Sequence, residues 1–190
     1  MSASIEKKRQ LILSKLQALI KKKLSAKKAA LISDFAKCYF MTVSYEELSG
    51  REIGDLYGLL MSHWNLIETR KPGESKVRIY NPSKAQHGWQ SKYTVIEVSH
   101  DDMPFLVDSL RMEVNRNNFL IHLVIHLGGI QVVRDKQNKI VEICNRKNPA
   151  KGSSSEAPIF IEIDYQTDNE SLKKLEKNLQ RVLKDVTVAV

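Results

Sequence analysis

Residues 93–117 have the sequence YTVIEVSHDDMPFLVDSLRMEVNRN, in which a strand pattern gives way to a helix pattern. The segment from Tyr93 to Ser99 predicts a strand. From Met103 to Asn117 the apolar residues recur at helical spacing, and Asp102 stands where an N-terminal cap would lie. The apolar face of this helix consists of Met103, Leu106, Val107, Leu110 and Val114. The strand and the helix are the first two elements of an α+β domain.

The chain after this helix alternates apolar and polar residues, which predicts strands. We expect strands at 121–127, in a hairpin of 130–135 and 140–144, and at 159–163 after a polar loop at 147–156. Thr167 and Glu170 form a capping box for a final helix, because a hydroxyl and a carboxylate three residues apart satisfy the free amides of a helix start. The order is strand, helix, strand hairpin, strand, helix, which is most of a ferredoxin-like β-α-β-β-α-β unit.

The last strand of such a unit is missing or unclear in the sequence. Residues 187–190 could begin it, or they could continue the final helix. The chain ends on the apolar run Val-Thr-Val-Ala-Val, whereas termini are commonly polar and solvated. We therefore expect the domain to be truncated at its C-terminal end.

The chain before residue 71 predicts helices. From Ile5 to Phe40 it has no glycine or proline, and its apolar residues recur at helical spacing with a break near Ser25. Ser44 with Glu47 and Ser49 with Glu52 offer capping boxes, and a further helix ends before Lys71-Pro72-Gly73. A short strand around Val77 and Ile79 follows. The expected organisation is an N-terminal helical segment (1–70), a linker strand and loop (71–92) and the α+β domain (93–190).

The composition is that of a folded globular protein without structural disulfides. The 190 residues are 42% hydrophobic and 27% charged, enough for one good core or two small ones. Cys38 and Cys144 lie far apart and in no metal-like spacing, which favours the reducing cytoplasm. The sequence contains no signal peptide and no stretch that approaches a membrane span.

The net charge of +8 comes from the first thirty residues. There Glu6 is the single acid, and the basic residues are Lys7, Lys8, Arg9, Lys15, Lys21, Lys22, Lys23, Lys27 and Lys28. We interpret this run as a solvated helix face in preference to a site for an anionic partner. Nonspecific binding of nucleic acid by this basic arm is the less favoured alternative.

Two spacing patterns resemble functional motifs but are explained without a function. Gly50, Gly54 and Gly58 are four apart, which indicates close packing against another helix or chance, since the charged residues among them exclude lipid. His122 and His126 are the closest histidine pair, but on a strand they would lie about 13 Å apart, too far to share a metal ion.

The turn at His100-Asp101-Asp102 is the candidate binding site. Backbone amides at a helix start carry partial positive charge and can hold a ligand carboxylate. The alternative is that Asp101 and Asp102 merely cap that helix. The sequence has no phosphate-binding loop and no Gly-x-Gly-x-x-Gly after a strand, so a dinucleotide site is not expected. The predicted strands also lack the basic and aromatic residues with which ferredoxin-like domains stack RNA bases.

Residues 101–109, Asp-Asp-Met-Pro-Phe-Leu-Val-Asp-Ser, resemble a signature of the large bacterial NAD-specific glutamate dehydrogenases. The resemblance covers roughly residues 35–190. It includes 55–58, 62–64, 77–82, 87–89, 112–116, 121–126 and 133–135 in the same order. Two positions depart from the family pattern: Leu127 stands where proline is expected, and Asn138 where the hairpin usually turns with glycine.

The resemblance implies that this chain is a non-catalytic, N-terminal part of a much longer enzyme. Similar proteins oxidise L-glutamate to 2-oxoglutarate with NAD, and their catalytic and NAD-binding domains come later. The implied fold is a helical segment followed by an ACT-like domain, a class that binds amino acids or packs into oligomers. No catalytic, cofactor-binding or metal-binding residue carries over. The residues implied to form an effector site or an interface are Asp101, Asp102, Met103, Pro104, Phe105, Asp108 and Arg111.

The leading hypothesis from the sequence is thus a cytoplasmic regulatory or assembly module. Its expected partners are the remaining domains of the parent enzyme, further copies in a homo-oligomer and an amino-acid effector. A pure interaction scaffold without a ligand is the first alternative, and nucleic-acid binding is the last.

Overall fold

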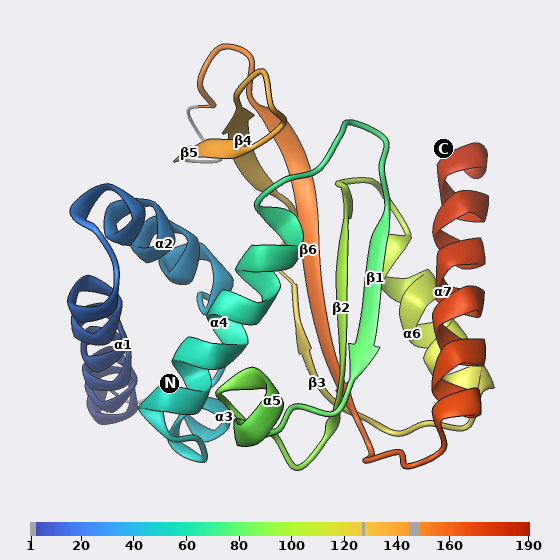
Figure 1. Ribbon diagram of the computed structural model, residues 1–190, viewed down its shortest axis with the longest axis horizontal. Coiled ribbons are helices and arrows are strands. Elements are labelled where there is room, and N and C mark those ends of the chain that lie inside the picture. Colours follow the sequence, from blue (N-terminus) through green and yellow to red (C-terminus); the bar gives the residue numbers. More distant parts are fainter. Residues whose placement is uncertain (1–2, 127, 145–148) are drawn as a thin grey trace.

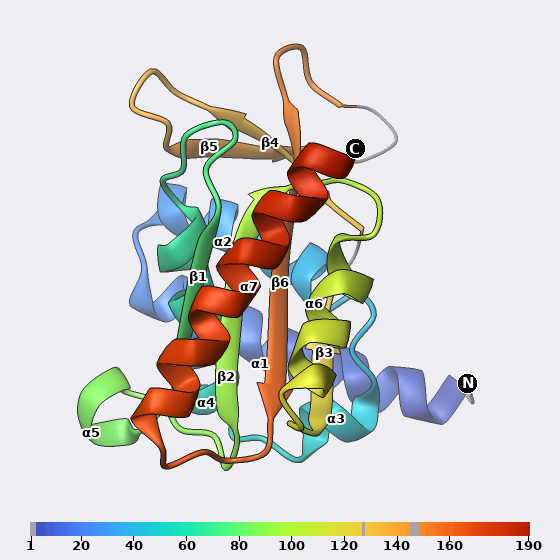
Figure 2. The same ribbon diagram turned by 90° about the vertical axis from the view of Figure 1, so that its right-hand side faces the viewer.

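One antiparallel sheet lies between two layers of helices in the computed structural model, which describes residues 3–126, 128–144 and 149–190 (Figure 1). The helices are α1 (Ala3–Lys23), α2 (Ala26–Tyr39), α3 (Tyr45–Ser49), α4 (Ile53–Ile67), α5 (Lys84–His87), α6 (Leu106–Arg116) and α7 (Asn169–Ala189). The strands are β1 (Lys76–Tyr80), β2 (Thr94–Asp101), β3 (Ile121–Ile125), β4 (Ile130–Arg134), β5 (Ile140–Cys144) and β6 (Ser154–Ile163). Helices α1 to α4 cover one face of the sheet, and Figure 2 shows α6 and α7 across the other.

The expected α+β fold is confirmed, with the elements β2, α6, β3, β6 and α7 in the order of a β-α-β-β-α-β unit. Strand β6 is ten residues long and pairs with β2 along one side. Its other side pairs with β4 near Glu156 and with β3 near Phe160, so the hairpin of β4 and β5 is an insertion that extends the sheet beyond the unit.

The position of the missing fourth strand is occupied by a strand from elsewhere in the chain. Strand β1 pairs with β2 on the side away from β6, where the last strand of such a unit would lie. Strand β1 lies within the segment 71–92 that the sequence assigned to a linker strand and loop, and its pairing with β2 makes it part of the sheet. Residues 187–189 continue helix α7.

The helix boundaries confirm some of the predicted caps and correct others. Ser25 separates α1 from α2 as expected, and Ser44 accepts a hydrogen bond from the Glu47 amide as the cap of α3. The box of Ser49 with Glu52 was wrong, because Ser49 ends α3 and Glu52 itself precedes α4. The cap of α7 is Asp168, one residue after the predicted Thr167. Its carboxylate accepts from two amides, which a single hydroxyl does less well.

The two faces of the sheet are both buried, but they differ in chemistry. The face under α6 and α7 is aliphatic, with Ile96, Val98, Ile159, Ile161 and Ile163 packed against Leu110, Leu175, Leu179 and Leu183. On the opposite face, Val95 and Phe160 contribute to the core beneath α1, α2 and α4. The fully buried Glu97 and Glu162 belong to that second face, so its helical layer is held by more than apolar packing.

The hairpin between β4 and β5 explains one departure from the family pattern. Asn138 has a φ of 61°, in the left-handed region that glycine adopts freely and asparagine tolerates. The Asp135 carboxylate accepts hydrogen bonds from the amides of Gln137 and Lys139 and fixes the turn. The other departure, Leu127, and the start of the predicted polar loop at Lys147 lie outside the described residues.

The glycine spacing reflects one close contact. An added Cβ at Gly58 would lie 2.1 Å from the Cβ of Trp89, a buried residue of the loop after α5. Gly54 has nothing within 4 Å, and Gly50 lies outside α4. The close approach is therefore between α4 and a loop rather than between two helices. No helix among the described residues is long and apolar enough to cross a membrane.

We predict opposite effects for alanine at two glycines of α4. Gly58→Ala should lower the free energy of unfolding by about 1–3 kcal/mol, because the methyl group displaces Trp89. Gly54→Ala should be neutral or stabilise by up to about 1 kcal/mol through helix propensity. Urea unfolding monitored by tryptophan fluorescence measures both. Equal effects at the two positions would contradict the assigned contact.

Candidate functional site

The predicted site forms the turn between β2 and α6. Asp101 is the last residue of β2 and Leu106 the first of α6, with residues 102–105 between them. The prediction that α6 begins at Met103 with Asp102 as its cap was wrong. The capping position is Phe105, whose side chain offers no oxygen, so the first amides of α6 have no side-chain cap.

Asp101 is bound from the direction of the helical layer. Its carboxylate accepts hydrogen bonds from the Arg70 guanidinium at 2.5 Å and from the Gly73 amide at 2.9 Å. Both partners lie between α4 and β1. Asp101 therefore joins the turn to the helical layer, and its carboxylate is already engaged.

Asp102 is bound from the direction of β6. Its amide donates to the Ser155 carbonyl and its carboxylate accepts from the Ser155 hydroxyl, both at 3.0 Å. Gly129 lies so close that an added Cβ would be 2.2 Å from the carboxylate oxygen of Asp102. Asp102 therefore connects the turn with the start of β6 and packs closely against the loop before β4.

The remaining predicted residues divide into a buried anchor and an exposed group. Met103 is half-buried and packs against the core beneath α6. Phe105 has a φ of 65°, a left-handed backbone conformation that costs free energy in a residue other than glycine. Its side chain is 72% exposed. Pro104, Asp108 and Arg111 are exposed, and no hydrogen bond or ion pair joins the side chain of Asp108 or Arg111 to another described residue.

A buried network that sequence reasoning missed lies behind this turn. Glu156, 3% exposed, receives a two-pronged ion pair from Arg134, with both N–O distances 2.7 Å. Arg70, 1% exposed, bridges Glu156 to Asp101 and also donates to the carbonyls of Lys71 and Glu74. Burial alone would raise the pKa of Glu156, but the hydrogen bonds from the two arginines outweigh it and lower that pKa.

Two further buried glutamates on this face are also matched by arginines. Glu162 of β6 pairs with Arg51, which precedes α4. Glu97 of β2 pairs with Arg78 of the neighbouring strand and accepts from the Tyr80 hydroxyl. Burial, reinforced by Glu97, raises the pKa of Tyr80, so this phenol stays protonated and acts as a donor. None of the three carboxylates is free to act as a general base.

His63 of α4 occupies a similar structural position. It is fully buried, its Nδ1 lies 2.7 Å from the Tyr39 hydroxyl, and its Nε2 lies 3.0 Å from the Val98 carbonyl. A carbonyl only accepts, so Nε2 carries the proton and Nδ1 accepts from Tyr39. Burial lowers the pKa of His63, which keeps the ring neutral in this arrangement. The histidine connects α2, α4 and β2.

The residues considered for metal binding and nucleophilic chemistry have other contacts. His122 stacks on Tyr93 with ring centres 4.2 Å apart. Cys38 and Cys144 are not bonded to each other, and burial raises the pKa of the Cys38 thiol, which disfavours the thiolate. Within 3–126, 128–144 and 149–190, no three side chains of histidine, cysteine, aspartate or glutamate are placed to hold a metal ion.

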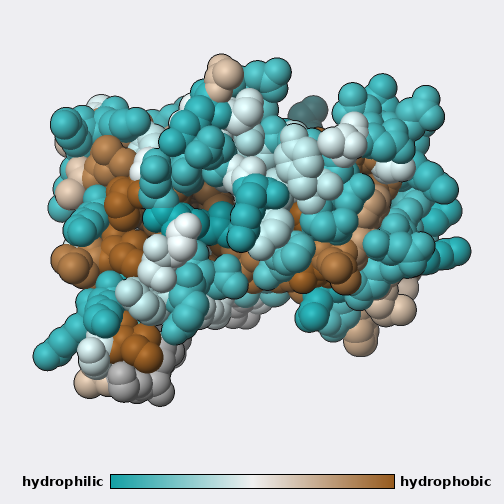
Figure 3. Space-filling view, turned by 90° about the horizontal axis from the view of Figure 1, so that it is seen from below, coloured by the Kyte–Doolittle hydropathy of each residue, from teal (hydrophilic) through white to brown (hydrophobic). Residues whose placement is uncertain are grey.

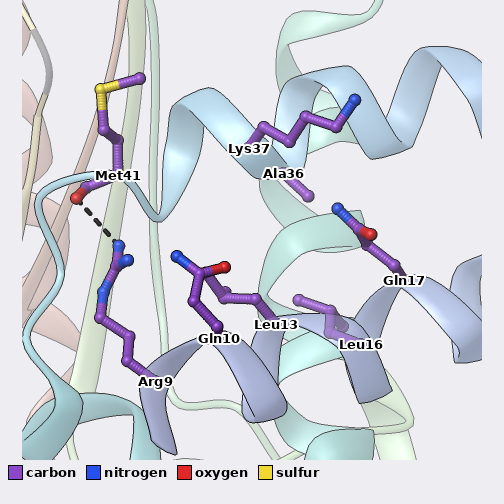
Figure 4. A pocket seen from close by; sticks show the side chains of 8 residues that line it. All are labelled: Arg9, Gln10, Leu13, Leu16, Gln17, Ala36, Lys37 and Met41. Carbon is purple, nitrogen blue, oxygen red and sulfur yellow. Dashed lines mark hydrogen bonds between the residues drawn. The ribbon is translucent and has the colours of Figure 1, made fainter. Parts of the chain in front are cut away.

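A shallow groove of about 200 Å³ lies between α1 and α2 (Figure 4). Arg9 lies at one end of it, but its guanidinium donates to the carbonyls of Phe40, Met41 and Val43 at the end of α2. This arginine thus satisfies carbonyls of the segment that follows α2 and has no free charge to offer a ligand. The groove offers amide groups and apolar walls but no buried, unused charge.

The comparisons with known proteins agree with the fold. The family model described as "Glutamate dehydrogenase, ACT1 domain" matches residues 35–179. The chain is 36% identical over 179 residues to the NAD-specific glutamate dehydrogenase of Halomonas elongata, covering 94% of this chain and 11% of that protein. It is 37% identical over 175 residues to the protein of the same name from Pseudomonas aeruginosa, covering 92% and 11%. The chain spans about a tenth of the length of these relatives.

We predict that Glu156→Gln has a lower free energy of unfolding than the wild type above pH 5, and that the difference disappears in acid. The lowered pKa of Glu156 means that its contribution to stability is complete above the unfolded-state value near 4.5 and is lost as the pH falls below that value. At pH 7 the variant should be less stable by about 3 kcal/mol, because Arg70 and Arg134 lose a buried partner. Urea unfolding at pH 7, 5, 4 and 3 measures the difference.

The control is Glu142→Gln, which changes an exposed glutamate of β5 and should shift stability by less than about 0.5 kcal/mol at each pH. A deficit in Glu156→Gln that stays constant from pH 7 to pH 3 would contradict the ion-pair assignment.

Proposed function

This chain belongs to the glutamate dehydrogenase ACT1 domain family, and we propose that it is the amino-terminal regulatory or assembly module of a large NAD-specific glutamate dehydrogenase. The observation that carries the proposal is the difference in coverage. The alignments span 94% and 92% of this chain but only 11% of each relative. The parent enzyme would convert L-glutamate and NAD to 2-oxoglutarate, ammonia and NADH. Oxidation of L-glutamate by the full-length protein with NAD tests this part.

The chemistry would then lie outside this chain. The buried carboxylates of the described residues are committed to arginines, and the thiol of Cys38 is disfavoured as a nucleophile. NAD would bind to another domain of the parent. The unpaired cysteines support our proposal that this parent is cytoplasmic.

Amino-acid sensing at the β2–α6 turn is the sharper form of the proposal. The uncapped amides at the start of α6 and the Arg111 guanidinium are suited to a ligand carboxylate, and the Asp108 carboxylate to its ammonium group. Asp101, Asp102 and Met103 would hold the shape of the turn, while Pro104 and Phe105 would cover the ligand. The exposed charges on one turn of helix, unused by other described residues, support this reading.

The alternative is an interface without a ligand. Phe105, Met112 and Leu120 are each about 70% exposed and lie on or beside α6, so they could bury against another domain or a second copy of the chain. A homo-oligomer would follow if this surface is self-complementary. Nucleic-acid binding has no such support on this side of the molecule.

We predict a selective rise in the melting temperature of this chain with one amino acid among glutamate, aspartate, arginine and other common ones. Ligand at about a hundred times its dissociation constant contributes about 2.7 kcal/mol, a shift of several degrees for a chain of this size. Arg111→Ala should remove the shift without lowering the melting temperature of the free chain, because this exposed side chain has no hydrogen bond or ion pair with a described residue. Lys173→Ala on α7 is the matched control and should keep the shift.

A shift that survives Arg111→Ala would contradict the site at this turn. Absence of a shift with any amino acid would favour the interface alternative, which light scattering of the same sample tests by its molecular mass.

A further inference from the structure

The lysines of α1 form a concentrated basic surface at one end of the molecule. Nine of the 30 basic residues and one of the 22 acidic residues lie in the first thirty positions, so the other 21 of each sign cancel. We define the lysine face as Lys7, Lys8, Lys15, Lys21 and Lys22, all exposed. No carboxylate of a described residue lies within 4.0 Å of any of these five ammonium groups. The charge of the whole chain is thus equal to the excess at this end.

Contacts within the structure and the helix dipole account for only some of these positive charges. Lys28 pairs with Glu68, and Lys23 lies over the ring of Tyr57. Lys21 and Lys22 lie in the last turn, where cations stabilise a helix. Lys7, Lys8 and Lys15 gain nothing from the helix dipole, which favours cations only in that turn. These three lysines are exposed and have no ion pair with a described residue, so they are available to an anionic surface.

The lysine face is long, straight and accessible. Lys8, Lys15 and Lys22 are seven residues apart, so they lie on one side of α1 at intervals of about 10 Å. Helix α1 lies at the outer side of the helical layer, and its N-terminal end extends past the sheet in Figure 2. Figure 3 shows the underside, where hydrophilic residues predominate and hydrophobic ones appear between them at the α1 end.

We propose that the lysine face of α1 docks on an acidic surface of the remaining polypeptide of the parent protein. This inference rests on the proposed function, since it requires that parent. The relatives continue for about nine-tenths of their length outside the match. The alignment with the Halomonas elongata protein covers 179 of the 190 residues, so at most 11 residues lie outside it. More than half of α1 is therefore part of the region shared with these longer relatives.

The structure disfavours two other anionic partners. Leu16 and Ile20, on the apolar side of α1, are fully buried against the body, and Leu11 is the one large apolar side chain of α1 that is mainly exposed, so the helix lacks the continuous apolar face that inserts into a bilayer. Helix α1 has no aromatic residue, and its single arginine is bound by carbonyls, so nothing on it could stack on nucleic-acid bases.

The test is carbodiimide cross-linking of the full-length protein, which joins an amine to a carboxylate only where the two are in contact. We expect Lys8, Lys15 or Lys22 to be joined to aspartates or glutamates beyond the 190 residues of this chain. The yield of these cross-links should fall at least tenfold in 1 M NaCl, because the Debye length there is only about 3 Å and the attraction between exposed charges is screened. Lys173, Lys177 and Lys184, exposed on α7, are the control and should give no such salt-sensitive products.

The variant K8E/K15E/K22E, compared with K173E/K177E/K184E, completes the test, and it should abolish the α1 cross-links while the α7 variant keeps them. Cross-links from α1 that stay within this chain, or none at all, would overturn the inference. So would salt-sensitive binding of this chain to a DNA duplex that the α1 variant removes. If the full-length protein fails to oxidise L-glutamate with NAD, the proposed function fails, whatever the cross-links show.

Discussion

Three glutamates buried on one face of the sheet, Glu97, Glu156 and Glu162, must each meet a cation, and the arrangement of the helical layer depends on that requirement. A buried carboxylate left without its partner destabilises a protein by about 3–5 kcal/mol, which is comparable to the whole stability of a small domain. Arg51 before α4 and Arg70 after it supply two of the cations. Helix α4 is consequently fixed at both ends over β6, with His63 bonded to β2 in its middle.

The same network determines the shape of the turn that we propose as the functional site. Arg70 binds Asp101 and Glu156 while Arg134 binds Glu156, so one network of ion pairs joins the end of β2, the start of β6 and the hairpin of β4 and β5. A ligand or a neighbouring domain at the turn would act on the helical layer through Arg70. Helices cover both faces of the sheet, and the turn, the exposed side of α6 and the lysine face of α1 are the surfaces to which we assign the proposed regulation and assembly.

Local patterns in the sequence predicted much of this fold, because helix and strand periodicities are properties of neighbouring residues. The strand at Tyr93, the aliphatic face of the last helix and the break at Ser25 are all confirmed. The ion pairs could not be predicted from the sequence. Arg51 and Glu162 are 111 residues apart, and a glutamate in an alternating strand commonly faces solvent. The pairing of β1 with β2 could not be predicted for the same reason, because it depends on the topology of the whole sheet. At the turn, Asp102 resembled a cap but binds Ser155, a partner that only the tertiary structure supplies.

Hydrogen exchange of this chain, wild type against Arg70→Met, tests most directly whether the buried network couples the turn to the helical layer. Methionine keeps much of the arginine volume and removes the charge. The account predicts faster exchange in residues 68–74, at the β2–α6 turn and at the start of β6 together, while the amides of α7 keep their protection. Faster exchange confined to residues 68–74 would show that the turn does not depend on Arg70, and would contradict the account.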